Sequence, residues 1–142
     1  KCRIAYNKEI VSIEYIPYQV RPVSSLRLVK DNTIEYSWKT TNRETINRLF
    51  ASRQKYDDIL IVKNDLITDT SICNVAFSDG NRWKTPEKPL LKGTQREYLL
   101  RRGTIQEARI STDDISKYKH ISLFNAMIGF GEIILPITSI NI

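Results

Sequence analysis

The stretch Tyr36-Ser-Trp-Lys39-Thr-Thr-Asn-Arg-Glu-Thr-Ile-Asn-Arg-Leu-Phe50 decides how the rest of the chain is interpreted. Polar and apolar residues alternate over residues 33–38, which predicts a strand. After it, apolar side chains recur at helical spacing and predict an amphipathic helix with one buried stripe, formed by Ile46, Leu49 and Phe50. Lys39 therefore lies between a predicted strand and a predicted helix.

Lys39 falls just before the N-terminus of that helix. Thr41 followed three residues later by Glu44 has the spacing of a capping box, so we expect Thr41 to be the N-cap. The positive end of a helix disfavours a nearby ammonium group, and a lysine with a lowered pKa can act as an amine nucleophile. Spacing alone leaves two interpretations of Lys39 open: an amine nucleophile, or a solvated lysine at the end of a strand.

Composition and charge are those of an ordinary single domain. The chain has 142 residues, of which 41% are hydrophobic and 27% charged, enough for one buried core. No apolar stretch is long enough to span a bilayer, so we expect a cytoplasmic protein without membrane contact. The net charge of +6 comes from scattered lysines and arginines, without a basic run interleaved with aromatic residues. We therefore expect no nucleic-acid partner, although the charge keeps nucleic-acid binding as an alternative without a motif.

The cysteines and the single histidine predict no metal site. Cys2 and Cys73 lie in strand-like apolar contexts without metal-ligand spacing, and we expect both to be reduced, buried thiols. His120 is the only histidine, so neither a histidine-rich metal site nor a His–carboxylate–Ser triad is expected.

The remaining pattern predicts one domain of mixed strands with few helices. The nearly continuous apolar run at 57–62 predicts a central strand buried on both faces. Gly93 opens a helix that runs through Arg101 and that Gly103 can terminate. Further strands are expected at 3–6, 11–15, 26–29, 66–68, 69–77, 82–85, 104–110 and 120–128, with turns at 63–65 and 78–81 and a short helical turn from Thr112 capped by Ser111 or Thr112.

Lys39-Thr-Thr-Asn42-Arg43 resembles the Lys-x-x-Asn-Arg segment of class IV PLP-dependent enzymes. That family includes branched-chain and D-amino-acid aminotransferases and aminodeoxychorismate lyase. The resemblance implies that Lys39 holds pyridoxal 5′-phosphate (PLP) covalently and, once displaced by the substrate amine, moves protons as general base and acid. It also implies an α+β fold of the D-amino-acid aminotransferase type, mainly a β pseudo-barrel with a few flanking helices.

A second part of the family pattern lies downstream. Asp69, with Asn74 five positions later, resembles the family's Glu-x-x-x-x-Asn pattern, whose acid pairs with the pyridine nitrogen of PLP. The aspartate is one methylene shorter than the usual glutamate, but it supplies the same negative charge. By this resemblance Asp69 keeps the pyridinium protonated, and Asn74 belongs to the cofactor-binding residues.

Two further segments complete the resemblance. Residues 90–96, Leu-Leu-Lys-Gly93-Thr94-Gln95-Arg, resemble the family's Leu-x-Gly-Ile-Thr-Arg loop, whose backbone N–H groups would hold the cofactor phosphate at a helix N-terminus. Thr94 stands where isoleucine is usual and Gln95 where threonine is usual. Phe124-Asn125-Ala126-Met127 resembles the Cys-Asn-Ala-Leu segment of aminodeoxychorismate lyases, which makes Asn125 the second expected phosphate ligand.

Taken together, the resemblance covers residues 1–137 and implies a lyase. We expect residues 1–142 to be one domain, the larger, PLP-binding domain, lacking the small N-terminal domain that family members carry ahead of it. The implied reaction is release of pyruvate from 4-amino-4-deoxychorismate or a similar small-molecule amino substrate, by a homodimer. Two alternatives stay open: a branched-chain or D-amino-acid aminotransferase, and a non-catalytic relative that has lost the cofactor.

Overall fold

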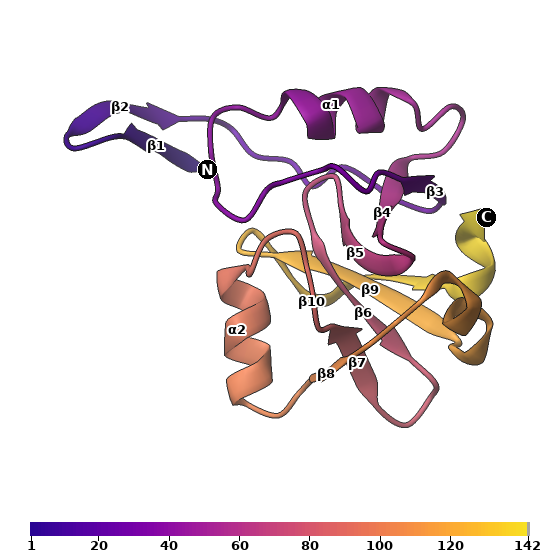
Figure 1. Cartoon of the computed structure of the whole chain (residues 1–142). Helices are drawn as coiled ribbons and strands as arrows, with labels where there is room; N and C mark the ends of the chain where they lie inside the picture. Colours follow the sequence, from indigo (N-terminus) through magenta and orange to yellow (C-terminus); the bar gives the residue numbers. More distant parts are fainter. Residues whose placement is uncertain (142) are drawn as a thin grey trace.

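Three sheets and two α-helices make up residues 1–141, which are the residues described by the structure, a computed structural model (Figure 1). In chain order the elements are β1 (Cys2–Tyr6), β2 (Ile10–Tyr15), β3 (Leu26–Lys30), α1 (Glu44–Ala51), β4 (Asp58–Lys63), β5 (Leu66–Thr70), β6 (Asn74–Ser78), β7 (Trp83–Pro86), α2 (Thr94–Arg101), β8 (Gln106–Ala108), the 3₁₀ helix η1 (Thr112–Lys117), β9 (His120–Asn125), β10 (Ile128–Pro136), the 3₁₀ helix η2 (Ile137–Ser139) and β11 (Ile140–Asn141).

Two of the sheets pack face to face around the main core. One has the strand order β11-β3-β4-β5 and the other β10-β9-β6-β7-β8. Side chains of both sheets share one buried apolar cluster, with Leu60 and Val62 contributed by β4, Val75 and Phe77 by β6, and Ile121 by β9. This arrangement confirms the mainly β, α+β class that the sequence predicts.

Each helix covers the outer face of one sheet (Figure 1). On the side away from the main core, Ile59 and Ile61 of β4 pack with Ile46 and Leu49 of α1. All four apolar residues of β4 are therefore buried, which confirms the predicted central strand with two buried faces. On the other sheet, Ala76 of β6 and Phe124 of β9 pack against Leu99 of α2.

Several local predictions are confirmed by the backbone. Asn64 and Asp65 both have positive φ, +52° and +63°, as a tight hairpin between β4 and β5 requires. Gly93 is the N-cap of α2, and Gly103 follows its C-cap with φ +67°. Ser111 caps η1 through a capping box with Asp114.

The predicted strand at 33–38 is wrong, because a side chain competes for its backbone. Asp31 Oδ1 accepts hydrogen bonds from the backbone N–H of Thr33 and of Ile34 and from Thr33 Oγ1. Such a turn closes on itself and leaves no ladder for a neighbouring strand. Residues 31–43 are therefore an irregular connection between β3 and α1.

The predicted capping box of α1 is also wrong. The helix begins at Glu44, its N-cap position is Arg43, and no side chain caps it in the usual way. Instead, the side-chain oxygen of Asn42 accepts a hydrogen bond from the Glu44 N–H at 3.1 Å. Thr41 lies one residue before this turn and is exposed.

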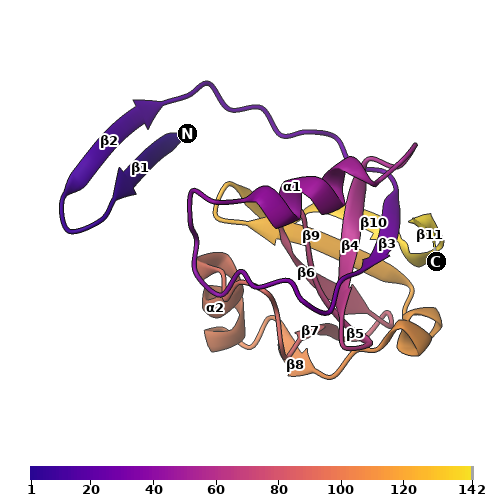
Figure 2. The same ribbon diagram turned by 45° about the horizontal axis from the view of Figure 1, so that its top comes forward.

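The third sheet is the β1–β2 hairpin, which stands away from the other two sheets (Figure 2). One of its faces carries the Arg3–Glu14 ion pair, and the other carries the exposed Ile4 and Ile13 opposite each other. Cys2 lies in this hairpin and is exposed, so the prediction of a buried thiol is wrong for Cys2, whereas Cys73 is buried; both are free thiols. Within residues 1–141, no helix is both long and apolar enough to cross a membrane.

Candidate functional site

Lys39 lies in the connection between β3 and α1, with its side chain exposed. Because β3 and β4 pair in parallel and α1 lies between them in the chain, this connection is the strand-to-helix loop of a β-α-β unit. Connecting loops of this kind often carry binding and catalytic residues. The structure thus gives Lys39 an accessible amine on an irregular segment instead of the strand end that the sequence predicts.

Asp69, near the end of β5, is the buried acid of the site. Its Oδ1 accepts a hydrogen bond from Asn74 Nδ2 at 2.9 Å, and its Oδ2 accepts one from the Leu91 N–H at 2.9 Å. Burial raises the pKa of Asp69 to about 6, against the opposing effects of these two hydrogen bonds and of the Arg96 charge. A carboxylate in this state binds a cationic partner favourably, because a positive charge offsets the loss of solvation.

Asn74 connects Asp69 to the loop before α2. Its Nδ2 also donates to the Leu91 carbonyl at 2.8 Å, so the same amide group holds the acid and the loop. A Cβ on Gly93 would lie 2.2 Å from Asn74 Oδ1, which means that only glycine fits over this side chain. Gly93 has an ordinary φ of −68°, so the close approach alone requires the glycine.

The first turn of α2 presents backbone donors next to this glycine. The N–H groups at the start of an α-helix have no acceptor within the helix and form an anion-binding end. Thr94 is exposed and Gln95 half-buried, and no hydrogen bond of either side chain is seen in the described part of the chain. If an anion binds here, the backbone of Gly93 to Gln95 supplies most of the contacts.

Asn125 closes the turn between β9 and β10 and holds a neighbouring turn. Its Oδ1 accepts hydrogen bonds from the N–H groups of Met127 and Ile128, at 2.8 and 3.0 Å. Its Nδ2 donates to the Ile72 carbonyl at 3.1 Å and lies 3.4 Å from Cys73 Sγ. Asn125 therefore joins the β9–β10 turn to the β5–β6 turn that follows Asp69.

The expected site residues come from four segments. The β5–β6 turn, the β9–β10 turn, the start of α2 and the connection that carries Lys39 lie on the same side of the molecule (Figures 1 and 2). Hydrogen bonds link Asp69, Asn74 and the Leu91 loop to each other and Asn125 to the β5–β6 turn. Lys39 itself has no side-chain hydrogen bond within residues 1–141, and it joins the group through its neighbours in the chain.

Two arginines near the site were assigned no role from sequence. Arg43 donates to the Ser71 carbonyl at 2.7 Å and so ties the Lys39 connection to the β5–β6 turn. Arg96 is only 2% exposed and donates to the Pro86 carbonyl and to Glu107, while its buried Nε has no hydrogen-bond partner among residues 1–141. Both arginines end segments that resemble the family pattern, but the sequence does not show their hydrogen-bond partners, so their roles could not be assigned from it.

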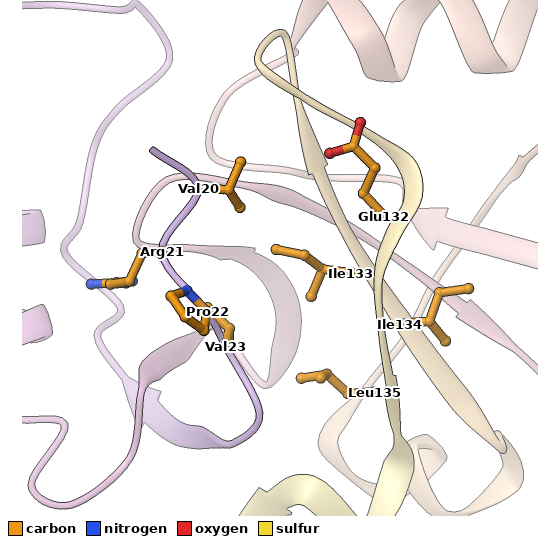
Figure 3. Close-up of a pocket in the computed structure, with 8 residues that line it drawn as sticks. All are labelled: Val20, Arg21, Pro22, Val23, Glu132, Ile133, Ile134 and Leu135. Carbon is orange, nitrogen blue, oxygen red and sulfur yellow. The ribbon is translucent and has the colours of Figure 1, made fainter. Parts of the chain in front are cut away.

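Two of the hollows on the surface of the described residues differ in what they offer a ligand. A groove of about 370 Å³ separates residues 20–23 from β10 (Figure 3). Its lining is mainly apolar, and Arg21 points away from it toward Asp58, to which it donates at 2.7 Å. A second hollow, of about 480 Å³, is formed by the connection beside Lys39, with Tyr36 and Arg43 among its lining residues. The second hollow has the polar groups that a ligand site needs.

The residues at the site fit the chemical groups of PLP. An exposed lysine supplies the amine, and the Asp69 carboxylate keeps acceptor capacity for a further donor beyond its two hydrogen bonds. The N-terminus of α2, which follows the N-cap Gly93, offers free backbone N–H groups that can bind a phosphate. Among the described residues, no group of three or more histidine, cysteine or acidic side chains could hold a metal ion.

Comparison with known proteins places the chain in a family. A profile of the amino-transferase class IV family matches residues 8–140, and the chain belongs to this family of PLP-dependent enzymes. It is 46% identical over 129 residues to an uncharacterized protein of Haemophilus influenzae, an alignment that covers 91% of this chain and 69% of that protein.

Two solved structures share the fold over most of the chain. A candidate 4-amino-4-deoxychorismate lyase from Haemophilus somnus is 39% identical, with a TM-score of 0.85, covering 90% of this chain and 66% of the other. A candidate amino-acid aminotransferase from Mesorhizobium loti is 26% identical, with a TM-score of 0.74, covering 94% and 70%. These matches confirm the predicted family and fold, and the chain spans about two thirds of the length of these relatives.

Proposed function

We propose that this chain is the cofactor-binding part of a PLP-dependent enzyme of the 4-amino-4-deoxychorismate lyase type. The observation that carries the proposal is the buried Asp69 carboxylate, held by Asn74 and Leu91 beside the glycine-opened start of α2. The connection between β3 and α1, which carries the exposed Lys39, lies on the same side of the molecule as the start of α2 (Figure 1). The Haemophilus somnus relative, a candidate lyase, supports this branch of the family.

Each residue has a separate task in this proposal. Bound PLP supplies an electron sink for the negative charge that develops beside the substrate amine. Lys39 holds the cofactor through its Nζ and, once released, takes up or delivers a proton as general base and acid. The Asp69 carboxylate would pair with the protonated ring nitrogen of PLP.

Backbone N–H groups and a side-chain amide would bind the phosphate of PLP. The N–H groups of Gly93, Thr94 and Gln95 would bind the phosphate at the start of α2. Asn125 is the second proposed phosphate ligand, although in the structure its amide already holds two turns together. Asn74 donates hydrogen bonds to the Asp69 carboxylate and to the Leu91 carbonyl, and so holds the acid and the loop together.

An aminotransferase is the second candidate function. The same lysine, acid and phosphate-binding turn serve amino transfer, and the Mesorhizobium loti relative, a candidate amino-acid aminotransferase, supports it. The two reactions separate by product: pyruvate from 4-amino-4-deoxychorismate in the first case, and an amino acid formed from a keto acid in the second. A homodimer, as the family resemblance implies, stays a prediction that sedimentation of the full-length protein would test.

The test is cofactor capture followed by product analysis. Full-length protein incubated with PLP should turn yellow, and borohydride reduction followed by peptide mass analysis should place the cofactor on Lys39. The Lys39→Ala variant should carry no cofactor at position 39 and lose product formation by about 10²–10⁴-fold. Protein that stays colourless with added PLP would instead be the non-catalytic relative, and the proposal would be wrong.

A further inference from the structure

Arg43 holds together the segment that carries Lys39. Its Nη1 donates to the Tyr36 hydroxyl at 3.1 Å, and its guanidinium lies over the Tyr36 ring, 5.5 Å from the ring centroid. Tyr36 precedes Lys39 and Arg43 follows it, so this contact closes residues 36–43 into a loop. Arg43 is also the N-cap position of α1, with its carbonyl accepting from the Asn47 N–H at 2.8 Å.

The same guanidinium ties this loop to the turn beside the buried acid. Arg43 Nη2 donates to the Ser71 carbonyl at 2.7 Å, and Ser71 follows Asp69 by two residues. The other side-chain hydrogen bonds of this loop, from Thr40 to the Asn42 carbonyl and from the Glu44 N–H to Asn42, are local. Within residues 1–141, the bond to Ser71 is therefore the one hydrogen bond from residues 36–43 to a segment beyond α1.

Burial makes this contact stronger than a surface hydrogen bond. Arg43 and Tyr36 are half-buried, and Ser71 is 5% exposed. A hydrogen bond from a charged donor to a carbonyl shielded from water is worth more than one on the surface, and removing the donor leaves that carbonyl unsatisfied. Lys39, in contrast, is exposed and makes no side-chain hydrogen bond in the described structure, so its own side chain does not fix the position of its backbone.

We propose that Arg43 is a positioning residue that sets the place of Lys39 relative to the Asp69 turn. It acts through the loop and touches neither reacting atoms nor cofactor. The catalytic meaning of this placement rests on the proposed function, whereas the anchoring of the loop does not. The two are therefore tested by separate measurements.

The anchoring is measured by proteolysis of the full-length protein without added cofactor. An endoproteinase that cleaves after lysine reports how often each lysine-bearing segment opens. In Arg43→Met, cleavage after Lys39 should be about tenfold faster than in wild type, as expected for losing a hydrogen bond from a charged donor. Cleavage after Lys92, which is exposed before α2, should be unchanged and serves as the internal reference.

The positioning is measured by the rate at which PLP becomes attached to each lysine. Borohydride reduction at timed intervals followed by peptide mass analysis gives the rates at Lys39 and Lys92 separately. Arg43→Met should slow PLP attachment at Lys39 about tenfold and leave the attachment rate at Lys92 unchanged. Arg43→Lys keeps a charged donor, so its attachment rate at Lys39 should lie between those of Arg43→Met and wild type. Arg48→Met is the matched control: Arg48 lies on the same helix, is 66% exposed, pairs with Asp31, and should change neither rate.

A further variant tests whether Tyr36 and Arg43 act as one unit. Tyr36→Phe removes the hydroxyl that Arg43 binds, so the double variant should cleave after Lys39 no faster than Arg43→Met alone. Wild-type cleavage after Lys39 in Arg43→Met, or equal acceleration at Lys39 and Lys92, would overturn the proposal. If Arg43→Met does not fold, Arg43→Lys decides: cleavage after Lys39, separated by peptide mass from the added cleavage site at position 43, should be faster than in wild type but by less than tenfold, and wild-type cleavage would overturn the proposal. Wild-type protein that never attaches PLP at Lys39 refutes the proposed function, while the proteolysis still decides the anchoring.

Discussion

Replacing Gly93 by alanine should destabilise the protein through Asn74. The new Cβ would lie 2.2 Å from Asn74 Oδ1, whereas ordinary contacts begin at 3.4 Å, so the amide must retreat by about 1 Å. At that displacement both bonds of Asn74 Nδ2, to Asp69 at 2.9 Å and to the Leu91 carbonyl at 2.8 Å, are broken. A hydrogen bond to a charged group contributes about 1.5–3 kcal/mol and a neutral one about 1 kcal/mol.

The expected cost of Gly93→Ala is therefore about 3 kcal/mol. For a chain of this length that lowers the midpoint of thermal unfolding by about 6–12 °C. Urea unfolding of wild type and variant gives the free energy of unfolding directly. Gly129→Ala is the control: its Cβ would displace only the end of the flexible, exposed Glu132 side chain, so it should cost no more than the surface hydrogen bond from the Gly129 N–H to Glu132 Oε1, about 1 kcal/mol.

A second background shows whether the clash with Asn74 is the cause. Asn74→Ala removes the atom that the new Cβ would meet, so Gly93→Ala should cost less than about 1 kcal/mol in that background, a coupling of about 2 kcal/mol. Equal costs in both backgrounds, or an unchanged stability of Gly93→Ala in wild type, would refute the reasoning.

Three further perturbations give separate checks. The pKa of Asp69 is about 6, above its value of about 3.9 in an unfolded chain, so the native state binds more protons between these values. The free energy of unfolding of wild type should therefore rise, relative to that of Asp69→Asn, by up to about 3 kcal/mol as the pH falls from about 7 to 4. Urea titrations of both proteins at each pH would measure this difference. Hydrogen bonds from the hydroxyl and N–H of Ser24 lower the pKa of Asp57 to about 2. Asp57→Ala should therefore reduce the free energy of unfolding by about 1–2 kcal/mol near pH 7, and this difference from wild type should disappear as the pH falls from about 4 to 2. Arg21→Met should cost about 3 kcal/mol in urea unfolding, because it leaves the buried Asp58 carboxylate without its partner, and adding Asp58→Asn should recover part of the loss.

Strands and turns with a strong local pattern could be predicted from the sequence. The continuous apolar run of β4 predicts a strand buried on both faces, and α1 and the main core cover those faces. The turn at Asn64 and Asp65 and the glycines that bound α2 act over a few residues, so spacing reveals them. The α+β class follows from such elements.

The connection that carries Lys39 could not be predicted, because contacts distant in sequence and one side chain decide it. Alternation over residues 33–38 suggests a strand, yet the Asp31 side chain takes up the backbone donors that a strand would use. The contact between Arg43 and the Ser71 carbonyl joins residues 28 positions apart. In the same way, the residues of the candidate site were identified by family resemblance, while the amide that joins Asp69 to the Leu91 loop became visible only in three dimensions.

The two cysteines give the protein a pair of built-in chemical reporters. Cys2 lies exposed on the β1–β2 hairpin, whereas Cys73 is 5% exposed and burial, with the nearby Asp58 charge, raises its pKa to about 12. Because the thiolate is the reactive form, a maleimide probe should modify Cys2 within minutes and reach Cys73 only when its surroundings open. A label on Cys2 would then report the orientation of the hairpin, and the slow modification of Cys73 would time the opening of the turn that Asn125 holds.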